Sequence, residues 1–217
     1  MNKTAILLGA TGLTGRILLN LLLFDPNYKK IKVISRTTVG FKNPKLEEHL
    51  IDLFELEKHK EIFFADEVFC CVGTTKAKTP DKETYRKIDY GIPVVAAKLC
   101  KENNINTFIV ISAMGANTKS TIFYNKIKGE MERDVIKQNL KNTYILQPGL
   151  IVGVRNEKRI GEKIGGIILK FLNPIVPKKY RTISPEIIAK AMIVLTRSEY
   201  FETRIENHII KELANNA

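Results

Sequence analysis

The segment Gly9–Gly15, with the sequence GATGLTG, constrains the fold of this chain more than any other feature. It directly follows the apolar run AILL and directly precedes the run RILLNLLLF, which places glycines between a predicted strand and a predicted helix. Gly9 permits a tight turn, Gly12 lets a pyrophosphate approach the main chain, and Gly15 lets the helix pack close to the strand. The amides of residues 12–14 would then face the anion. The pattern favours a dinucleotide-binding turn, and an ordinary glycine-rich turn is the alternative.

Short apolar runs alternate with helical patterns along the following part of the chain. Strands are expected at 4–9, 32–35, 48–52, 67–72, 107–112 and 143–147. Helices are expected at 12–23, 56–62, 82–102 and 122–139, where apolar residues recur at helical spacing. This alternation predicts an α/β fold, a Rossmann-like doubly wound parallel sheet with helices on both faces.

The pattern changes after residue 149. An apolar helix candidate lies at 164–172, and a later helix is expected to begin at Ser184 and Pro185, because serine caps free amides and proline suits a first turn. Ligands of doubly wound sheets bind at the carboxyl ends of the strands. We therefore expect one domain, 1–217, in which 1–149 form the cofactor-binding core and 150–217 form a short carboxyl-terminal substrate-covering segment.

The charge of the chain is unbalanced, with 35 Lys and Arg against 23 Asp and Glu and a net charge of +12. Such an excess is compatible with a nucleic acid, an anionic membrane surface or an acidic small molecule as partner. The lysines are scattered, and few aromatic residues stand among them to stack on bases. We therefore expect no nucleic-acid partner and interpret most of the charge as a solvated basic surface.

Cysteines, histidines and apolar stretches bear on location and on metal binding. The three cysteines lack metal or clear disulfide spacing, and the start of the chain lacks the apolar core of a signal peptide, so we expect a cytoplasmic protein. The apolar stretches at 17–24 and 164–176 are interrupted well short of the roughly 20 residues that a span requires. No membrane span is therefore expected. The histidines His49, His59 and His208 show no helical pairing, so no metal site is expected.

The end of the second predicted strand bears on the choice of cofactor. A protein selective for NAD usually offers an acidic residue there to the adenosine ribose. Here Arg36 stands at that point, and with Ser35 and Thr37 it could pair with a 2′-phosphate through charge-assisted hydrogen bonds. The pattern favours NADP (NADPH) over NAD, and the alternative is that Arg36 is merely an exposed residue at a strand end.

Two further strand ends supply candidate cofactor contacts. Asp52 closes the third predicted strand, where it could accept a hydrogen bond from the adenine amino group or cap the following helix. The fourth strand leads into CVGTT at 71–75, where the main chain can pass close to a ribose or pyrophosphate, with Gly73 the leading candidate. The residues expected to contact the cofactor up to this point are Gly9, Thr11, Gly12, Leu13, Thr14, Gly15, Ser35, Arg36, Asp52, Leu53, Val72, Gly73 and Thr74.

Ser112, Tyr124 and Lys128 are the candidate catalytic residues. Tyr124 and Lys128 stand four residues apart in a predicted helix, which places them on one face, one turn apart. An ammonium at that distance favours the phenolate and lowers the tyrosine pKa, which would suit Tyr124 to exchange a proton near neutrality. Ser112 closes the fifth predicted strand and could hold the substrate oxygen in the same cleft.

The glycine loop, Ser112 and the Tyr-x-x-x-Lys pair together resemble the short-chain dehydrogenase/reductase superfamily. The chain is most similar to its atypical NADPH-binding branch around the mammalian HIV Tat-interacting oxidoreductase. That likeness rests on 71–75 (CVGTT), 85–89 (YRKID) and 124–130 (YNKIKGE), and it covers about the whole chain.

The resemblance implies a role for each site residue. Tyr124 would be the general acid/base, Lys128 would lower its pKa and bind the nicotinamide ribose, and Ser112 would polarise the carbonyl. Pro148 and Gly149, after the sixth strand, would touch the nicotinamide. The chain departs from the family pattern in three respects: CVGTT replaces NNAG of the standard branch, Gln147 stands where a related chain often has Arg, and the asparagine of the usual tetrad cannot be placed.

These observations favour an NADPH-dependent oxidoreductase that transfers hydride to a small carbonyl substrate, as a monomer or homodimer. One alternative is an NADPH-sensing interaction or regulatory protein, in which the cofactor orders the final third of the chain. Another is an epimerase or dehydratase that recycles its cofactor, although such relatives usually carry a much larger carboxyl-terminal substrate domain. The presence of Ser112, Tyr124 and Lys128 together favours the oxidoreductase.

Overall fold

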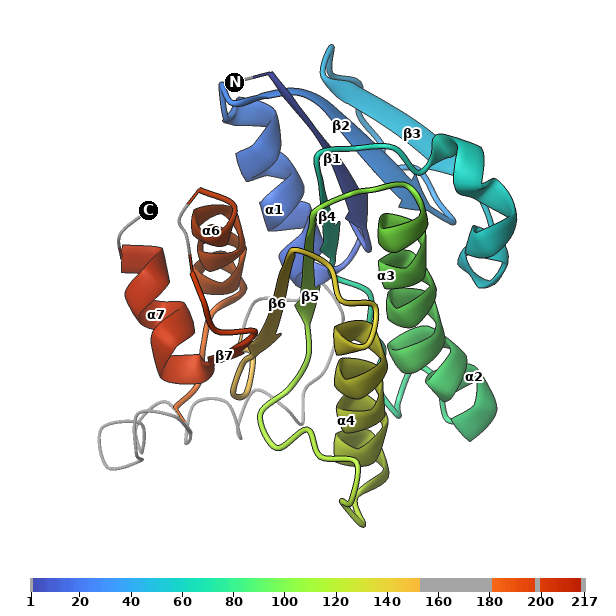
Figure 1. Ribbon diagram of the computed structural model, residues 1–217, viewed down its shortest axis with the longest axis vertical. Helices are drawn as coiled ribbons and strands as arrows, with labels where there is room; N and C mark the ends of the chain where they lie inside the picture. Colours follow the sequence, from blue (N-terminus) through green and yellow to red (C-terminus); the bar gives the residue numbers. More distant parts are fainter. Residues whose placement is uncertain (1, 153–180, 198–199, 216–217) are drawn as a thin grey trace.

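A seven-stranded parallel sheet runs through the part of the chain that the structure, a computed structural model, describes: residues 2–152, 181–197 and 200–215 (Figure 1). The strand order is β3-β2-β1-β4-β5-β6-β7. The strands are β1 (Lys3–Leu8), β2 (Tyr28–Ser35), β3 (Leu46–Leu50), β4 (Glu67–Cys70), β5 (Thr107–Ile111), β6 (Asn142–Gln147) and β7 (Arg204–Glu206). Each neighbouring pair is parallel, which confirms the predicted Rossmann-like α/β fold.

Helices cover both faces of this sheet (Figure 1). One face carries α1 (Leu13–Phe24), α6 (Pro185–Leu195) and α7 (Asn207–Asn215). The other carries the 3₁₀ segment η1 (Leu53–Ile62), α2 (Lys82–Arg86), the π-helical segment η2 (Lys87–Gly91), α3 (Ile92–Glu102) and α4 (Phe123–Ile136). Successive residues of β1 point to opposite faces, so Leu7 joins the first core and Leu8 joins the second.

The described carboxyl-terminal elements complete the sheet and one of its helical layers. Helix α6 packs on α1, and β7 pairs in parallel with β6. Ser184 caps α6 as predicted, with its hydroxyl accepting a hydrogen bond from the amide of Ile187. The substrate-covering role expected of 150–217 stays a prediction, and the helix expected at 164–172 lies outside the described residues.

The helix expected at 82–102 is interrupted by a π-helical segment. The chain runs from α2 through η2 into α3, and Asp89 lies buried within η2. Such wide turns are rare and often occur at functional sites. In this chain the segment carries the carboxylate that faces Lys128.

A glycine lets the loop after β5 lie directly against α4. A Cβ built on Gly129 would lie 2.4 Å from the carbonyl carbon of Asn117 and 2.5 Å from the amide nitrogen of Thr118. Asn117 also donates its amide to the carbonyl of Asn125 on the same helix. Because both partners are main chain, the space cannot be made by moving a flexible side chain.

We predict that Gly129→Ala lowers the free energy of unfolding by roughly 1–3 kcal/mol, because the methyl group would force helix and loop apart. Gly91→Ala is the matched control, because Gly91 is also helical and a Cβ there would meet nothing within 4 Å. That variant should be stabilised by about 0.4–1 kcal/mol. Urea unfolding monitored by circular dichroism measures both, and equal stability of the two variants would contradict the prediction.

Candidate active site

The glycine loop forms a tight turn against the neighbouring strand. Gly9 has φ +81°, and a Cβ on it would lie 2.7 Å from the carbonyl carbon of Cys71. A Cβ on Gly15 would lie 2.1 Å from the Gly9 oxygen, so only glycine permits this approach of helix to strand. No side chain caps the first amides of α1, and the Gly12 amide donates to the Gly9 carbonyl at 3.0 Å. The positive end of α1 is therefore presented as main chain alone.

The end of β2 places Arg36 at the surface. Arg36 is exposed and makes no hydrogen bond or ion pair with the described residues. Ser35 is buried, and its hydroxyl donates to the carbonyl of Thr37 at 2.7 Å. Ser35 therefore stabilises the main-chain turn that carries Arg36.

Asp52 caps the segment that follows β3. Its Oδ1 accepts a hydrogen bond from the amide of Phe54 at 3.0 Å, which is the capping alternative considered from the sequence. The next side chain, Leu53, is buried in the core, so only its main chain is available to a ligand. A contact between Asp52 and adenine remains a prediction.

The exit from β4 lies beside the candidate catalytic lysine. A Cβ on Gly73 would lie 3.4 Å from Asp89 Oδ1 and 4.0 Å from Lys128 Nζ. The Thr74 amide donates to Asp89 Oδ2 at 2.8 Å, whereas the side chain of Val72 is buried in the core. The hydrogen bond from Thr74 to Asp89 thus connects the β4 exit to the candidate catalytic residue Lys128.

Lys128 is buried in an ion pair. Its Nζ lies 3.0 Å from Asp89 Oδ1 and 3.4 Å from the carbonyl oxygen of Ile111 at the end of β5. Burial acts to lower the pKa of the ammonium, but the charges of Asp89 and Tyr124 act to raise it, and the net result is a raised pKa. Lys128 is therefore a permanent cation at neutral pH.

Tyr124 lies near Lys128 at the start of α4 and is 38% exposed. Burial of part of the ring raises the pKa of its phenol, the Lys128 ammonium lowers it, and the Asp89 carboxylate raises it. The net direction is upward. The sequence-based expectation of a lowered pKa is therefore wrong for this arrangement, because burial of the phenol outweighs the charge of Lys128, which Asp89 also opposes.

Ser112 points to a carboxylate that the sequence analysis did not single out. Its Oγ donates to Glu132 Oε1 at 2.6 Å, and both side chains are buried. Glu132 also accepts hydrogen bonds from Gln147 Nε2 at 2.9 and 3.1 Å and from Arg204 Nε at 2.8 Å. The missed signal was spacing, because Glu132 stands one helical turn beyond Lys128 and two beyond Tyr124.

Two of the three sequence stretches that carried the family resemblance contact each other. Arg86 of α2 forms an ion pair with Glu130 of α4, one turn from the pair between Asp89 and Lys128. The ring of Tyr85 packs edge-on against Phe123 with centroids 5.6 Å apart. The YRKID and YNKIKGE stretches therefore form one interface that sets the position of Lys128.

The turn after β6 is fixed from two sides. The carbonyl of Pro148 accepts from the Met114 amide at 3.0 Å, and the Gly149 amide donates to Asn207 Oδ1 at 2.9 Å. Asn207 in turn donates to the Arg181 carbonyl at 2.8 Å. Pro148 and Gly149 are thus held by the loop after β5 and by the start of α7.

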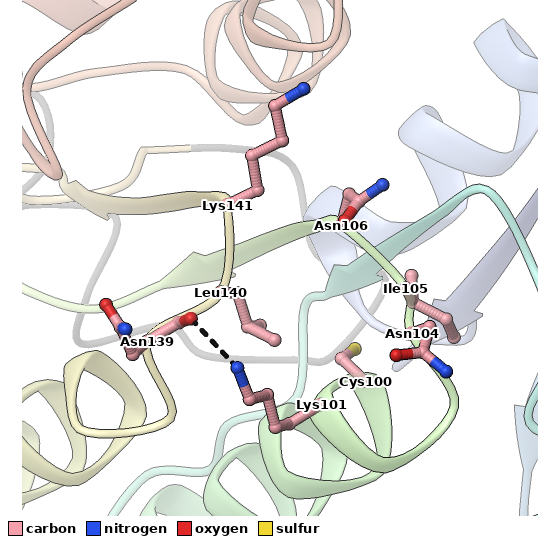
Figure 2. Close-up of a pocket in the computed structure, with 8 residues that line it drawn as sticks. All are labelled: Cys100, Lys101, Asn104, Ile105, Asn106, Asn139, Leu140 and Lys141. Carbon is pink, nitrogen blue, oxygen red and sulfur yellow. Dashed lines mark hydrogen bonds between the residues drawn. The ribbon is translucent and has the colours of Figure 1, made fainter.

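Two cavities flank these elements. The larger, about 330 Å³, lies between α4, the loop at 116–118 and the ends of β6 and β7, and Glu132, Gln147 and Arg204 contribute to its wall. Figure 2 shows the smaller, about 70 Å³, where Lys101 of α3 donates to the Asn139 carbonyl at 3.4 Å. The smaller cavity lies near the amino ends of β5 and β6, so it is remote from the candidate catalytic residues.

A family model described as HIM1 matches residues 33–173. The chain belongs to the HIM1 family. It is 36% identical to the mitochondrial protein FMP52 of Candida albicans, over 76% of this chain and 75% of that protein. It is 29% identical to the protein HTATIP2 of Rattus norvegicus, over 74% of this chain and 68% of that protein, which confirms the resemblance found in the sequence.

The fold is shared with solved structures of low sequence identity. One is the Bordetella bronchiseptica enzyme WbmH in complex with NAD⁺, with a TM-score of 0.70 and 16% identity. The match covers 99% of this chain and 80% of that one. The likeness establishes the architecture of this HIM1 family member and leaves its reaction to be argued from the site.

The cytoplasmic location expected from the sequence is contradicted, because fungal relatives of this chain are named mitochondrial proteins. Free cysteines suit any reducing compartment, so they do not distinguish the cytoplasm from a mitochondrial location. Among the described residues, no helix is long and apolar enough to cross a membrane. The same residues contain no group of three His, Cys, Asp or Glu side chains able to hold a metal ion.

We predict that Asp89→Asn lowers the free energy of unfolding at neutral pH by about 3–5 kcal/mol, because it leaves the Lys128 ammonium buried without its counterion. Burial would then lower the pKa of Lys128 in the folded state below its unfolded value. The folded variant would bind fewer protons than the unfolded chain, so its deficit should shrink as the pH rises from 7 towards about 10.

Asp66→Asn is the control for this variant. Asp66 is exposed and accepts a hydrogen bond from the Thr4 amide, much as Asp89 accepts from Thr74. Its loss should stay within about 0.5 kcal/mol and should not vary with pH in the same window. Denaturant unfolding at several pH values measures both variants, and a deficit in Asp89→Asn that is constant with pH would argue against the assigned charge.

Proposed function

We propose that this HIM1 family member is an NADPH-dependent oxidoreductase that reduces a small carbonyl substrate. The observation that carries the proposal is the arrangement of Tyr124 and Lys128 on one face of α4, with the lysine held by Asp89 beside the exit of β4. A partly exposed phenol next to a buried cation is suited to proton exchange with a ligand.

The residues present fit a dinucleotide. Cβ atoms at Gly9 and Gly15 would collide with the main chain, so this loop conformation requires glycine at both positions. The amides at the start of α1 have no side-chain cap, and they suit a pyrophosphate. The structure of WbmH, which shares this fold, was solved in complex with NAD⁺, and this supports the proposal that the glycine loop of this chain binds a dinucleotide. Residues 72–74 and the turn at Pro148 and Gly149 would bind the ribose and nicotinamide of the cofactor.

The cofactor would supply the hydride, and the chain would supply orientation and the proton. The phenol of Tyr124 is protonated at neutral pH because its pKa is raised, so it can donate its proton to the carbonyl oxygen as the hydride reaches the carbonyl carbon. The phenolate left behind is stabilised by the Lys128 ammonium. A proton from solvent then converts the Tyr124 phenolate back to the phenol.

Exposed apolar side chains beside Tyr124 favour an apolar substrate. Ile122 and Phe123, which directly precede Tyr124, are exposed at 60% and 36%, and Leu150 after β6 is exposed at 52%. Exposed apolar side chains next to a site suit an aliphatic or aromatic group. This supports the proposal of a small, weakly polar carbonyl compound as substrate.

We expect Tyr124→Phe to retain NADPH affinity and to lose at least about 100-fold in turnover, because it removes the proton donor and little volume. Tyr90→Phe is the control, since the Tyr90 hydroxyl donates to Asp134 away from the site. NADPH binding is measured by fluorescence titration, and turnover by nicotinamide absorbance with a panel of aldehydes and ketones. Turnover of Tyr124→Phe at the wild-type rate would exclude the assigned role.

We expect Arg36→Glu to weaken NADPH binding by about 10–100-fold while NADH affinity changes much less, because only NADPH carries the 2′-phosphate. Lys30→Glu makes a similar charge change at the other end of β2 and should leave both affinities unchanged. Titration of each variant with both cofactors measures this difference. Equal weakening of NADPH and NADH would mean that Arg36 does not bind the phosphate, and binding of neither cofactor by the wild type would exclude the function.

A further inference from the structure

The larger of the two cavities contains an arginine that is held by one edge. The cavity has a volume of about 330 Å³, and its wall includes Arg204 at the start of β7. Arg204 Nε donates to the Glu132 carboxylate at 2.8 Å, and only 2% of the Glu132 side chain is exposed. A buried carboxylate on α4 therefore fixes the position of the guanidinium in the wall.

The terminal nitrogens of Arg204 are available to a ligand. A guanidinium has five N–H groups in a planar fork, and the contact with Glu132 uses only its Nε side. Nη1 and Nη2 of Arg204 make no hydrogen bond with the described residues, and 51% of the side chain is exposed. The end of the fork, with one N–H group from each terminal nitrogen, has the geometry to bind a carboxylate through two parallel hydrogen bonds.

The charge of the cavity wall suits a monoanion. Its charged residues are Arg204, Arg133 and Glu132, which together carry one net positive charge. Arg133 already donates to Asp134 through both Nε and Nη2, so Arg204 is the arginine with its fork available. A dianion would place its second charge near the Glu132 carboxylate without a matching cation. A ligand with a single carboxylate therefore matches the wall best.

The rest of the wall is polar, which favours a hydrophilic ligand. Only Ala116 and Gly129 of the lining residues lack a polar side chain. The Thr118 hydroxyl and Gln147 Oε1 line the cavity and make no hydrogen bond with the described residues, so both can bind a ligand hydroxyl group. The volume lies at the lower end of the roughly 300–1,000 Å³ that small-molecule sites occupy. The cavity thus suits a small polar compound.

We propose that this cavity is a binding site for a small hydroxycarboxylate. Arg204 binds the carboxylate with the end of its fork, Glu132 positions Arg204, and Thr118 and Gln147 bind the hydroxyl group of the ligand. The glycine loop, Tyr124 and Lys128 do not line this cavity, so the site goes beyond the proposed oxidoreductase function. Binding here requires no dinucleotide.

Nuclear magnetic resonance titration of the ¹⁵N-labelled full chain with sodium lactate, in the absence of NADPH, tests the site. The Arg204 Nε–H signal and the amides of 116–118 should shift with a Kd of about 1 mM or tighter. Lactamide has nearly the same shape but no charge, so it should bind at least about tenfold more weakly. A parallel titration with sodium chloride at equal ionic strength corrects for screening of surface charges.

Three variants locate the bound lactate. Arg204→Lys keeps a cation beside Glu132 but lacks the planar fork, so lactate affinity should fall at least about tenfold. Ala116→Leu fills part of the cavity and leaves the ion pair intact, so it should cause a similar loss even if Arg204→Lys does not fold. Arg197→Lys is the matched control, because Arg197 pairs with the buried Asp25, is 47% exposed and does not line the cavity. Its lactate affinity should equal that of the wild type.

Four other results would overturn the proposal. Equal affinity for lactate and lactamide would mean that the carboxylate is not recognised, and no saturable shift up to about 50 mM lactate would mean that the cavity binds no such ligand. Wild-type affinity in both Arg204→Lys and Ala116→Leu would place the bound lactate elsewhere. Inorganic phosphate that binds at least about tenfold more tightly than lactate would contradict a site for a monoanionic carboxylate. None of these results bears on NADPH binding or carbonyl reduction, so the two proposals fail separately.

Discussion

The buried ion pair between Lys128 and Asp89 is the interaction on which the site depends. The pair joins α4 to the π-helical segment η2. Asp89 also accepts a hydrogen bond from the Thr74 amide at the β4 exit, and Lys128 donates one to the Ile111 carbonyl at the end of β5. Four elements therefore converge on one ammonium and one carboxylate. Removing either charge would leave the other buried and unpaired, which is much more costly than losing a surface pair. Burial raises the pKa of the Tyr124 phenol, and the Lys128 ammonium, which is paired with Asp89, only partly offsets that rise.

Much of the fold could be predicted from local pattern. Glycines 9, 12 and 15 stand where two main-chain segments approach closely and leave little room for a Cβ. A glycine at such a position can be recognised directly in the sequence. Ser184 and Pro185 mark the start of α6 for a similarly local reason. Strand β7 could not be predicted, because it is three residues long and only Ile205 of them is buried. A run of that length carries no recognisable alternation.

The site itself was only partly predictable, since its key contacts join residues distant in the chain. Tyr124 and Lys128 were found by their spacing, but Asp89 stands 39 residues before the lysine that it neutralises. No single-sequence pattern gives that pairing. Ser112 was placed correctly at a strand end, yet its proton is committed to Glu132, and the tyrosine pKa was misjudged because burial and a second charge enter only through the fold. Asp52 remained ambiguous because a helix cap and an adenine acceptor require the same residue type.

The packing of α6 on α1 determines when this chain can become stable. Leu18 and Leu22 of the first helix share a core with Ile188 and Met192 of α6, and Arg197 forms an ion pair with Asp25 just beyond α1. During synthesis the first helix is therefore complete long before its apolar partner leaves the ribosome. A chain ending at residue 149 would expose that apolar face and the unpaired edge of β6, both of which promote aggregation. Residues 2–149 and the described carboxyl-terminal elements thus share one core and depend on each other for stability.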